Sequence, residues 1–171
     1  GLMSFDVADV AALESNGILE AVILHEMGHV LGIGTLWPMK GLLGNPSLPN
    51  SAGVDTFFSG INAIAAFNSI GGTNYTGQRV PVENTQGDEG TRDAHWRESV
   101  FRNELMTRFV ANGPNPLSIV TIRSLQDLGY TVNAAAADAY SLPGAGIPAE
   151  PIRSTHLLRD VAPVPIRIGG S

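Results

Sequence analysis

The sequence predicts an α+β protein that is mainly helical and has long irregular loops. Three observations support this fold class: an apolar run with helical spacing near the start, two later helical runs bounded by glycine, and 20 glycines and 11 prolines concentrated largely between such runs. The 171 residues suit one compact domain, because domains most often contain about 100 to 150 residues. A folded chain of this length buries roughly 70% of the surface that its unfolded form exposes, so it can have its own core.

The first element with a clear period runs from residue 17 to residue 34 and is predicted to be a helix. Ser15 and Asn16 precede it and belong to the residue types that cap helix N-termini. Apolar residues cover nearly its whole circumference, which is typical of a helix buried in a core. Gly32 and Gly34 are expected to end it, because glycine adopts the left-handed conformation without steric cost.

The remaining elements are predicted from caps, proline and glycine. They are a short strand at 2–5, a helical turn at 6–13, an irregular loop at 37–55, a helix at 60–70 capped by Ser59, an extended piece at 79–82, and a helix at about 118–128 ended by Gly129. Residues 141–171 contain five of the 11 prolines and are predicted to form a tail that wraps or links.

Composition excludes several classes of function. The chain has no cysteine, so it has neither disulfides nor cysteine-based metal or nucleophile sites. The net charge of −6 and the lack of a Lys/Arg cluster argue against nucleic acid or an anionic membrane surface as a partner. No stretch approaches the roughly 18 apolar residues of a membrane span, so none is expected.

One motif in the first helix points to chemistry. Residues 25–29 read His-Glu-Met-Gly-His, and the spacing of 29 − 25 = 4 places both imidazoles on one helix face, about 6 Å apart along the axis. The two histidines can therefore share one cation. Glu26 is rotated by about 100° from His25, so it can reach a water on the metal rather than bind the metal in the same row. Without a metal, burying these polar side chains unpaired would cost several kcal/mol each.

A catalytic zinc site usually needs a third protein ligand. The compact metzincin pattern would place it at position 35, where this chain has Thr35. His95, 95 − 29 = 66 residues downstream, is the histidine candidate. A glutamate is the alternative, and Glu83, Glu89 and Glu98 are the candidates near His95.

The segment after His95 contains Glu104-Leu105-Met106, with the methionine 11 residues beyond the histidine. Together with the His-Glu-Met-Gly-His motif, the glycine after it, the long insertion and the distant histidine, this pattern resembles the leishmanolysin-type metzincins, and most closely a cysteine-free bacterial-type relative. The resemblance covers residues 1–142 and is most specific at 22–37 and 90–107. The long insertion is typical of that family, so Thr35 becomes an expected feature.

The resemblance implies a zinc metalloendopeptidase with zinc on His25, His29 and His95. It further implies Glu26 as the catalytic acid/base and Met106 as the residue of the Met-turn, an apolar floor beneath the zinc. The implied organisation is a catalytic core at 1–140, with the active-site helix at about 17–34, an insertion at 35–94, the third ligand and Met-turn at 95–107 and a C-terminal helix at about 118–128, followed by a tail at 141–171.

The resemblance also implies protein or peptide substrates and a secreted or cell-surface location. Only 24 residues precede His25, too few for the sheet subdomain that metzincins place before the active-site helix. The chain is therefore expected to be the C-terminal part of a longer protease, with the missing N-terminal part as a partner. Astacin-like and serralysin-like metzincins have a tyrosine two residues after the turn methionine, where this chain has Arg108.

Two further interpretations remain open at this point. Five carboxylates surround His95 in the sequence and could hold calcium, although a solvated acidic loop fits the same pattern: Glu83, Asp88, Glu89, Asp93 and Glu98. The second is functional: a non-catalytic binding module stabilised by zinc is the alternative to a peptidase, because the subdomain that carries the substrate-binding edge is expected to be largely missing.

Overall fold

The computed structural model describes residues 3, 5–48, 51–75, 78–85 and 91–144. Within them the chain forms five α-helices, two short 3-10 helices and three strands of two residues each. In chain order these are α1 (Val7–Ser15), α2 (Leu19–Leu31), β1 (Leu43–Gly44), β2 (Phe57–Phe58), α3 (Ile61–Ser69), η1 (Gly72–Asn74), β3 (Val80–Pro81), α4 (Glu98–Phe101), α5 (Ile119–Leu128) and η2 (Ala134–Ala136). The predicted α+β class, helical with long loops, is confirmed.

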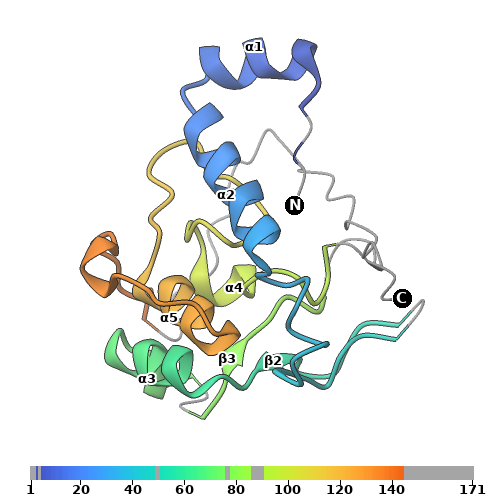
Figure 1. Cartoon of the computed structure of the whole chain (residues 1–171), viewed down its shortest axis with the longest axis vertical. Helices are drawn as coiled ribbons and strands as arrows, with labels where there is room; N and C mark the ends of the chain where they lie inside the picture. Colours follow the sequence, from blue (N-terminus) through green and yellow to red (C-terminus); the bar gives the residue numbers. More distant parts are fainter. Residues whose placement is uncertain (1–2, 4, 49–50, 76–77, 86–90, 145–171) are drawn as a thin grey trace, which may run out of the picture.

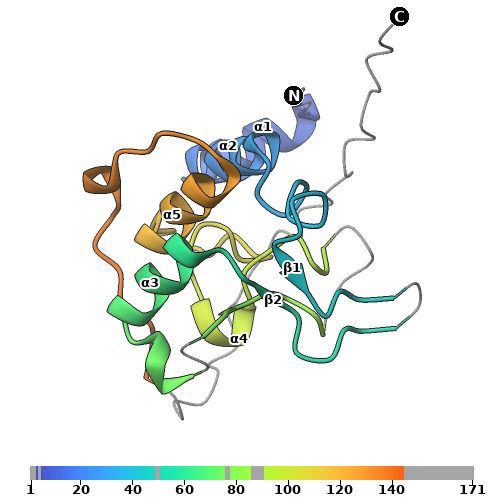
Figure 2. The same ribbon diagram turned by 60° about the horizontal axis from the view of Figure 1, so that its bottom comes forward.

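The helices are distributed from one end of the molecule's long axis to the other (Figure 1). α1 crosses one end, α2 runs from it toward the centre, and α3 and α5 lie at the opposite end. α3 and α5 pack against each other in both views (Figures 1 and 2). The strands form one antiparallel sheet in the order β1-β2-β3, with Phe58 facing Leu43 on one side and Val80 on the other.

The main core is a stack of aromatic rings around Trp96. Trp37 stacks on Trp96 with ring centroids 4.7 Å apart, and Phe101 also stacks on Trp96, with ring centroids 5.6 Å apart. Phe58 of β2 meets Trp96 edge to face at 5.7 Å. All four side chains are fully buried. Because Trp96 directly follows His95, the packing of the core also fixes the position of that histidine.

Helix α2 is shorter than predicted. It begins two residues after Gly17 and ends before Gly32, whose left-handed conformation (φ 111°) terminates it as expected. The prediction that Ser15 and Asn16 cap this helix was wrong. Both side chains instead donate hydrogen bonds to the carbonyl oxygen of Ala12, because another helix, α1, ends there and leaves carbonyls to be satisfied.

The prediction that α2 is buried on all sides was also wrong. One face is buried, formed by Val22, His25, Gly28 and His29. The opposite face exposes four apolar side chains: Leu24 (41%), Met27 (43%), Val30 (37%) and Leu31 (38%). The apolar periodicity of the helix was predicted correctly. That pattern does not show how much of the helix surface the rest of the protein covers.

The cap of α3 comes from a distant residue. Ser59, the predicted cap, donates its hydroxyl to the carbonyl of Leu42 instead. The carboxylate of Asp127 in α5 accepts hydrogen bonds from the backbone N–H groups of Asn62 (3.0 Å) and Ala63 (2.9 Å). This contact joins α3 to α5 and satisfies two donors of the first turn.

The other predicted elements compare as follows. Ser118 caps α5 by accepting a hydrogen bond from the Thr121 N–H, and Gly129 ends the helix in the left-handed conformation. The extended piece at 79–82 contains β3, and the loop at 37–55 contains β1. The described residues of the predicted strand at 2–5 form no strand, and most of the predicted tail at 141–171 lies outside the described residues.

Candidate metal centre

Three histidines from two distant parts of the chain meet in the centre of the protein. The Nε2 atoms of His25 and His29 lie 3.0 Å apart, and each lies 3.2 Å from Nε2 of His95. His25 is fully buried, His95 is 1% exposed and His29 is 8% exposed. Within the part of the chain that the structure describes, this is the one group of His and acidic side chains placed to hold a metal ion.

The other ring nitrogen of each histidine fixes its tautomer. Nδ1 of His25 lies 2.7 Å from the Leu105 carbonyl oxygen, and Nδ1 of His95 lies 2.8 Å from that of Thr91. Nδ1 of His29 lies 3.0 Å from the Ile33 carbonyl oxygen. A carbonyl oxygen can only accept, so each Nδ1 must carry the proton. In the neutral rings all three Nε2 atoms therefore present lone pairs to one another.

This arrangement fits a tetrahedral metal ion. Three lone pairs converging in a buried space repel one another unless a cation lies between them. Zinc binds histidine nitrogen at about 2.0 to 2.1 Å, which in a tetrahedron separates two ligand atoms by about 3.3 to 3.4 Å. The observed 3.0 to 3.2 Å is close to that spacing. Histidines whose outer nitrogen donates to a carbonyl are also the usual form of zinc ligand.

The last turns of α2 carry two of the three histidines, and the chain just after the helix holds one of them in place. His25 and His29 are one helical turn apart, on the buried face of the helix. Since Gly32 turns the chain at this point, the Ile33 carbonyl lies beyond the helix and accepts a hydrogen bond from His29 Nδ1. Glu26 lies in the same turn and is half-buried. The motif thus places an acid next to two of the three histidines.

A tight turn lies beneath the histidines. Residues 104–107 form a four-residue turn closed by the hydrogen bond from Thr107 N to Glu104 O (3.1 Å). Its Met106 is fully buried. A Cβ at Gly28, between the two histidines of α2, would lie 2.6 Å from Met106 Sδ. Met106 is therefore packed against the backbone of the helix at the position where the motif has its glycine.

His95 is placed by its own neighbours in the chain. Asp93 accepts hydrogen bonds from the backbone N–H (2.7 Å) and hydroxyl (2.9 Å) of Ser47. Glu83 pairs with this segment through its backbone, donating to the His95 carbonyl and accepting from the Asp93 N–H, both at 2.9 Å. Gly34 touches it from the other side, because a Cβ there would lie 2.4 Å from the Ala94 carbonyl oxygen.

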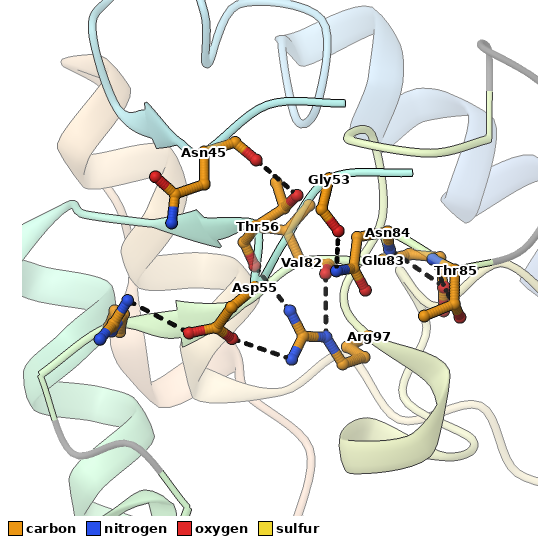
Figure 3. Close-up of polar contacts among 10 residues, drawn as sticks. Asn45, Gly53, Asp55, Thr56, Val82, Glu83, Asn84, Thr85 and Arg97 are labelled. Carbon is orange, nitrogen blue, oxygen red and sulfur yellow. Dashed lines mark hydrogen bonds and ion pairs between the residues drawn. The ribbon is translucent and has the colours of Figure 1, made fainter. Parts of the chain in front are cut away.

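Arg97 fastens the same segment to the sheet (Figure 3). Its guanidinium donates to the carbonyl oxygens of Val82 (3.1 Å) and Thr56 (2.8 Å) and pairs with Asp55 at 3.2 Å. Asn84 donates to the Gly53 carbonyl nearby, at 2.6 Å. The residues on both sides of His95 are thus held by contacts that were not predicted from the sequence.

The glutamates considered as alternative ligands lie differently. The carboxylate of Glu83 is buried and accepts from Thr85 and from the backbone N–H of Glu98 (3.1 Å), which commits it to the loop (Figure 3). Burial, and then the charge of Glu83, raise the pKa of Glu98 to about 7. Neither joins the histidine group. Glu89 lies outside the described residues, as does Asp88.

The calcium interpretation receives no support. Among the described residues, the carboxylates around His95 do not form a group that could hold a metal ion. Asp93 and Glu83 are both used in hydrogen bonds that shape the loop.

Some contacts of the site could not be predicted from the sequence. Backbone partners such as the Leu105 carbonyl have no recognisable signal in the sequence. Of the glycines that allow close approach, only the positions of Gly28 and Gly34, within or next to the motif, give any signal.

A buried group of three histidines, two of them on one helix that also carries a glutamate between them, is the arrangement of side chains typical of zinc metalloproteases. The chain belongs to the leishmanolysin family of peptidases (Peptidase M8), whose family model matches residues 1–143. Comparisons with curated proteins and with solved structures find no match. Proteases of this family depend on zinc, act on proteins, and are secreted or located at the cell surface. No described helix combines the length and apolar character that crossing a membrane requires.

Proposed function

We propose that this protein is a zinc endopeptidase in which His25, His29 and His95 hold the metal and Glu26 is the catalytic acid/base. The observation that supports this most strongly is the convergence of three Nε2 lone pairs within 3.0 to 3.2 Å, each ring being held by a carbonyl at Nδ1. Membership of a zinc-dependent protease family supports the same assignment. Protein or peptide chains are the proposed substrates, and secretion or the cell surface the proposed location.

The chemistry is divided between the metal and the chain. When bound, zinc lowers the pKa of a coordinated water to about 7 and polarises the carbonyl under attack. Glu26 follows His25 on α2 and is half-buried, so its carboxylate can accept a proton from the attacking water. It then delivers that proton to the departing amine. The three carbonyls at Nδ1 hold each ring in one orientation with its Nε2 facing the other two, so that no ring rotation is needed during the reaction.

Met106 is proposed as the residue of the Met-turn. It is fully buried in the turn at 104–107, and its sulfur lies against the backbone of α2 at Gly28. An apolar side chain at this place excludes water from one side of the histidines. It also limits how far the helix can move relative to the turn that supplies the Leu105 carbonyl to His25.

The decisive experiment compares Glu26→Gln with Glu20→Gln, an exposed glutamate on the same helix. Zinc content and cleavage of casein or a quenched peptide are measured for both. We expect Glu26→Gln to keep one zinc per chain and to lose about 10²- to 10⁴-fold in kcat, since acid–base catalysis contributes that much. Glu20→Gln should match the wild type in both measurements.

One observation favours a second candidate, the non-catalytic binding module. The outer face of α2 exposes four apolar side chains on one helix, and contiguous exposed apolar surface often marks an interaction site. The same experiment separates the two functions. Stoichiometric zinc without any cleavage that depends on Glu26 would favour the binding module and reject the peptidase.

A further inference from the structure

Glu104, a buried carboxylate that the proposed chemistry does not use, lies at the start of the turn under the histidines. It is 0% exposed. One carboxylate oxygen accepts from the Met106 N–H at 2.6 Å. The other accepts from the Ser118 N–H (3.0 Å), the Ser118 hydroxyl (2.6 Å) and the Thr121 hydroxyl (2.5 Å). Four donors from two segments thus converge on a single side chain.

Burying the Glu104 carboxylate costs free energy, and its four donors require a side chain with two accepting oxygens. Burial raises the pKa of Glu104 above its ordinary value, and the hydrogen bonds from Ser118, Thr121 and Met106 offset part of that rise. A buried carboxylate is tolerated only where such donors compensate for the lost water. A glutamine could not replace it fully, because its NH₂ group would face donors on one side and has no lone pair to offer them.

Two paths lead from Glu104 toward histidines of the site, one through the turn to His25 and one through Thr121 and Trp96 to His95. By accepting a hydrogen bond from the Met106 N–H, it fixes the turn whose Leu105 carbonyl accepts a hydrogen bond from His25 Nδ1 at 2.7 Å. The Thr121 hydroxyl that donates to Glu104 accepts in turn from the indole N–H of Trp96 at 2.8 Å.

Trp96 completes the second connection. It directly follows His95 in the chain, and its backbone N–H donates to the Met106 carbonyl at 3.0 Å. The Glu104 carboxylate is therefore separated from the Trp96 indole by two hydrogen bonds, and Glu104 directly precedes Leu105, whose carbonyl contacts His25. One path thus leads to His25 on α2 and the other to His95 on the distant loop.

We propose that Glu104 is a positioning residue for the metal centre: its carboxylate fixes the Leu105 carbonyl and Trp96, and through them the orientation of His25 and His95. This inference rests on the proposed function, in which these histidines hold zinc. It assigns the glutamate of the Glu-Leu-Met sequence a role distinct from that of Met106. Glu104 does not itself contact the metal or the substrate.

The test uses the whole chain loaded with zinc or with cobalt(II), whose visible absorption reports ligand geometry. We compare Glu104→Gln with Asp127→Asn, a carboxylate on α5 that also accepts several hydrogen bonds but is linked to no histidine. We expect Glu104→Gln to change the cobalt spectrum and to weaken zinc binding about 10- to 100-fold, the usual effect of removing an outer partner of a metal ligand. Asp127→Asn should lower the melting temperature and leave both metal readouts unchanged.

A second pair of variants covers the case in which Glu104→Gln does not fold. Thr121→Val keeps the side-chain volume but removes the acceptor of the Trp96 indole, whereas Thr121→Ser keeps the hydroxyl. We expect a changed cobalt spectrum and weaker zinc binding for Thr121→Val, and near wild-type values for Thr121→Ser. The proposal is overturned if folded Glu104→Gln, or Thr121→Val in its place, binds zinc within about twofold of the wild type with an unchanged cobalt spectrum.

The outcome for the wild type separates this inference from the proposed function. A wild-type chain that binds no zinc overturns both. A wild type that binds one zinc and cleaves peptides, combined with unaffected Glu104→Gln and Thr121→Val variants, overturns only the role of Glu104.

Discussion

His25 and His29 owe their relative position to one turn of α2, whereas His95 is placed by contacts from several separate segments. Along α2 the spacing of four residues is sufficient, and the helix needs only Gly32 to end it. At His95 the chain relies on Ser47, on the Glu83 backbone and on the close approach of Gly34. The comparison teaches that one site can combine two kinds of part. The helical half, His25 and His29 on α2, is encoded by local spacing, whereas the loop half, His95 and the segments that hold it, takes shape only in the folded protein.

The largest expected effect comes from removing a ligand of either half. We expect His25→Ala and His95→Ala each to weaken zinc binding by at least about 100-fold, more than outer partners usually contribute. The two variants should lose zinc affinity in the same way, because the metal does not distinguish a ligand on a helix from a ligand on a loop. Zinc titration against a competing chelator measures this.

His156→Ala is the control for these variants, since it removes the fourth histidine, which lies outside the described residues. It should bind zinc like the wild type. Full zinc occupancy and activity in His95→Ala would show instead that His95 is not a ligand, and would return the third position to a glutamate.

The sequence predicted the two halves unequally for the same reason. His25, Glu26 and His29 follow from periodicity and spacing within 5 residues. His95 became the preferred third ligand only through resemblance to a family, because nothing in its local sequence distinguishes a buried ligand from a solvated histidine. The contact of Asp93 with Ser47 spans 46 residues and leaves no local pattern.

The fold shows the same division. Helix ends set by glycine, such as Gly32 and Gly129, were predicted correctly because the left-handed conformation is a local property. The cap of α3 was not, since Asp127 supplies it from 64 residues away along the chain. The exposed face of α2 was missed because apolar periodicity marks a face that can be buried, and burial depends on what else the fold brings to it.

A backbone contact between the halves gives the next prediction. Gly34→Ala adds a Cβ that would lie 2.4 Å from the Ala94 carbonyl oxygen, at a residue with φ +74°. We expect a loss of about 3 kcal/mol in the free energy of unfolding, combining left-handed strain with overpacking. Zinc binding should weaken too, because Ala94 adjoins His95. Chemical denaturation and zinc titration measure the two effects.

Gly41→Ala is the matched control for this change. Gly41 has nearly the same conformation, φ +67°, but an added Cβ meets nothing within 4 Å. It should lose only the strain component, about 1 to 2 kcal/mol, and keep its zinc affinity. Equal losses in the two variants would mean that the approach of Gly34 to Ala94 has no energetic weight.

The loop half should also make stability depend on pH. The pKa of Glu98 rises from 4.5 to about 7 in the folded protein, so the stability linked to its protonated form is complete below pH 4.5 and is lost as the pH rises through 7. Glu98→Gln cannot ionise. The free energy of unfolding of Glu98→Gln minus that of the wild type should therefore be larger at pH 8 than at pH 5, by at most about 3 kcal/mol.

Urea denaturation at the two pH values measures this difference. Glu14→Gln is the control, because Glu14 is exposed on α1 and its substitution should leave the pH dependence unchanged. An identical pH profile for Glu98→Gln and wild type would mean that Glu98 is ionised in the folded protein at neutral pH.

The smallest expected effect concerns the contact between α2 and the side chain of Met106. Gly28→Ala would gain helix propensity, up to about 1 kcal/mol, but its Cβ would lie 2.6 Å from Met106 Sδ. The sulfur is near the end of a flexible side chain, so a shift can absorb part of the clash, and we expect a net loss of about 1 kcal/mol. A double-mutant cycle with Met106→Ala isolates the contact, because the added methyl would fill part of the cavity that Met106→Ala leaves. The coupling should exceed about 0.5 kcal/mol, whereas simple additivity would mean that the turn at 104–107 supports the helix through its backbone alone.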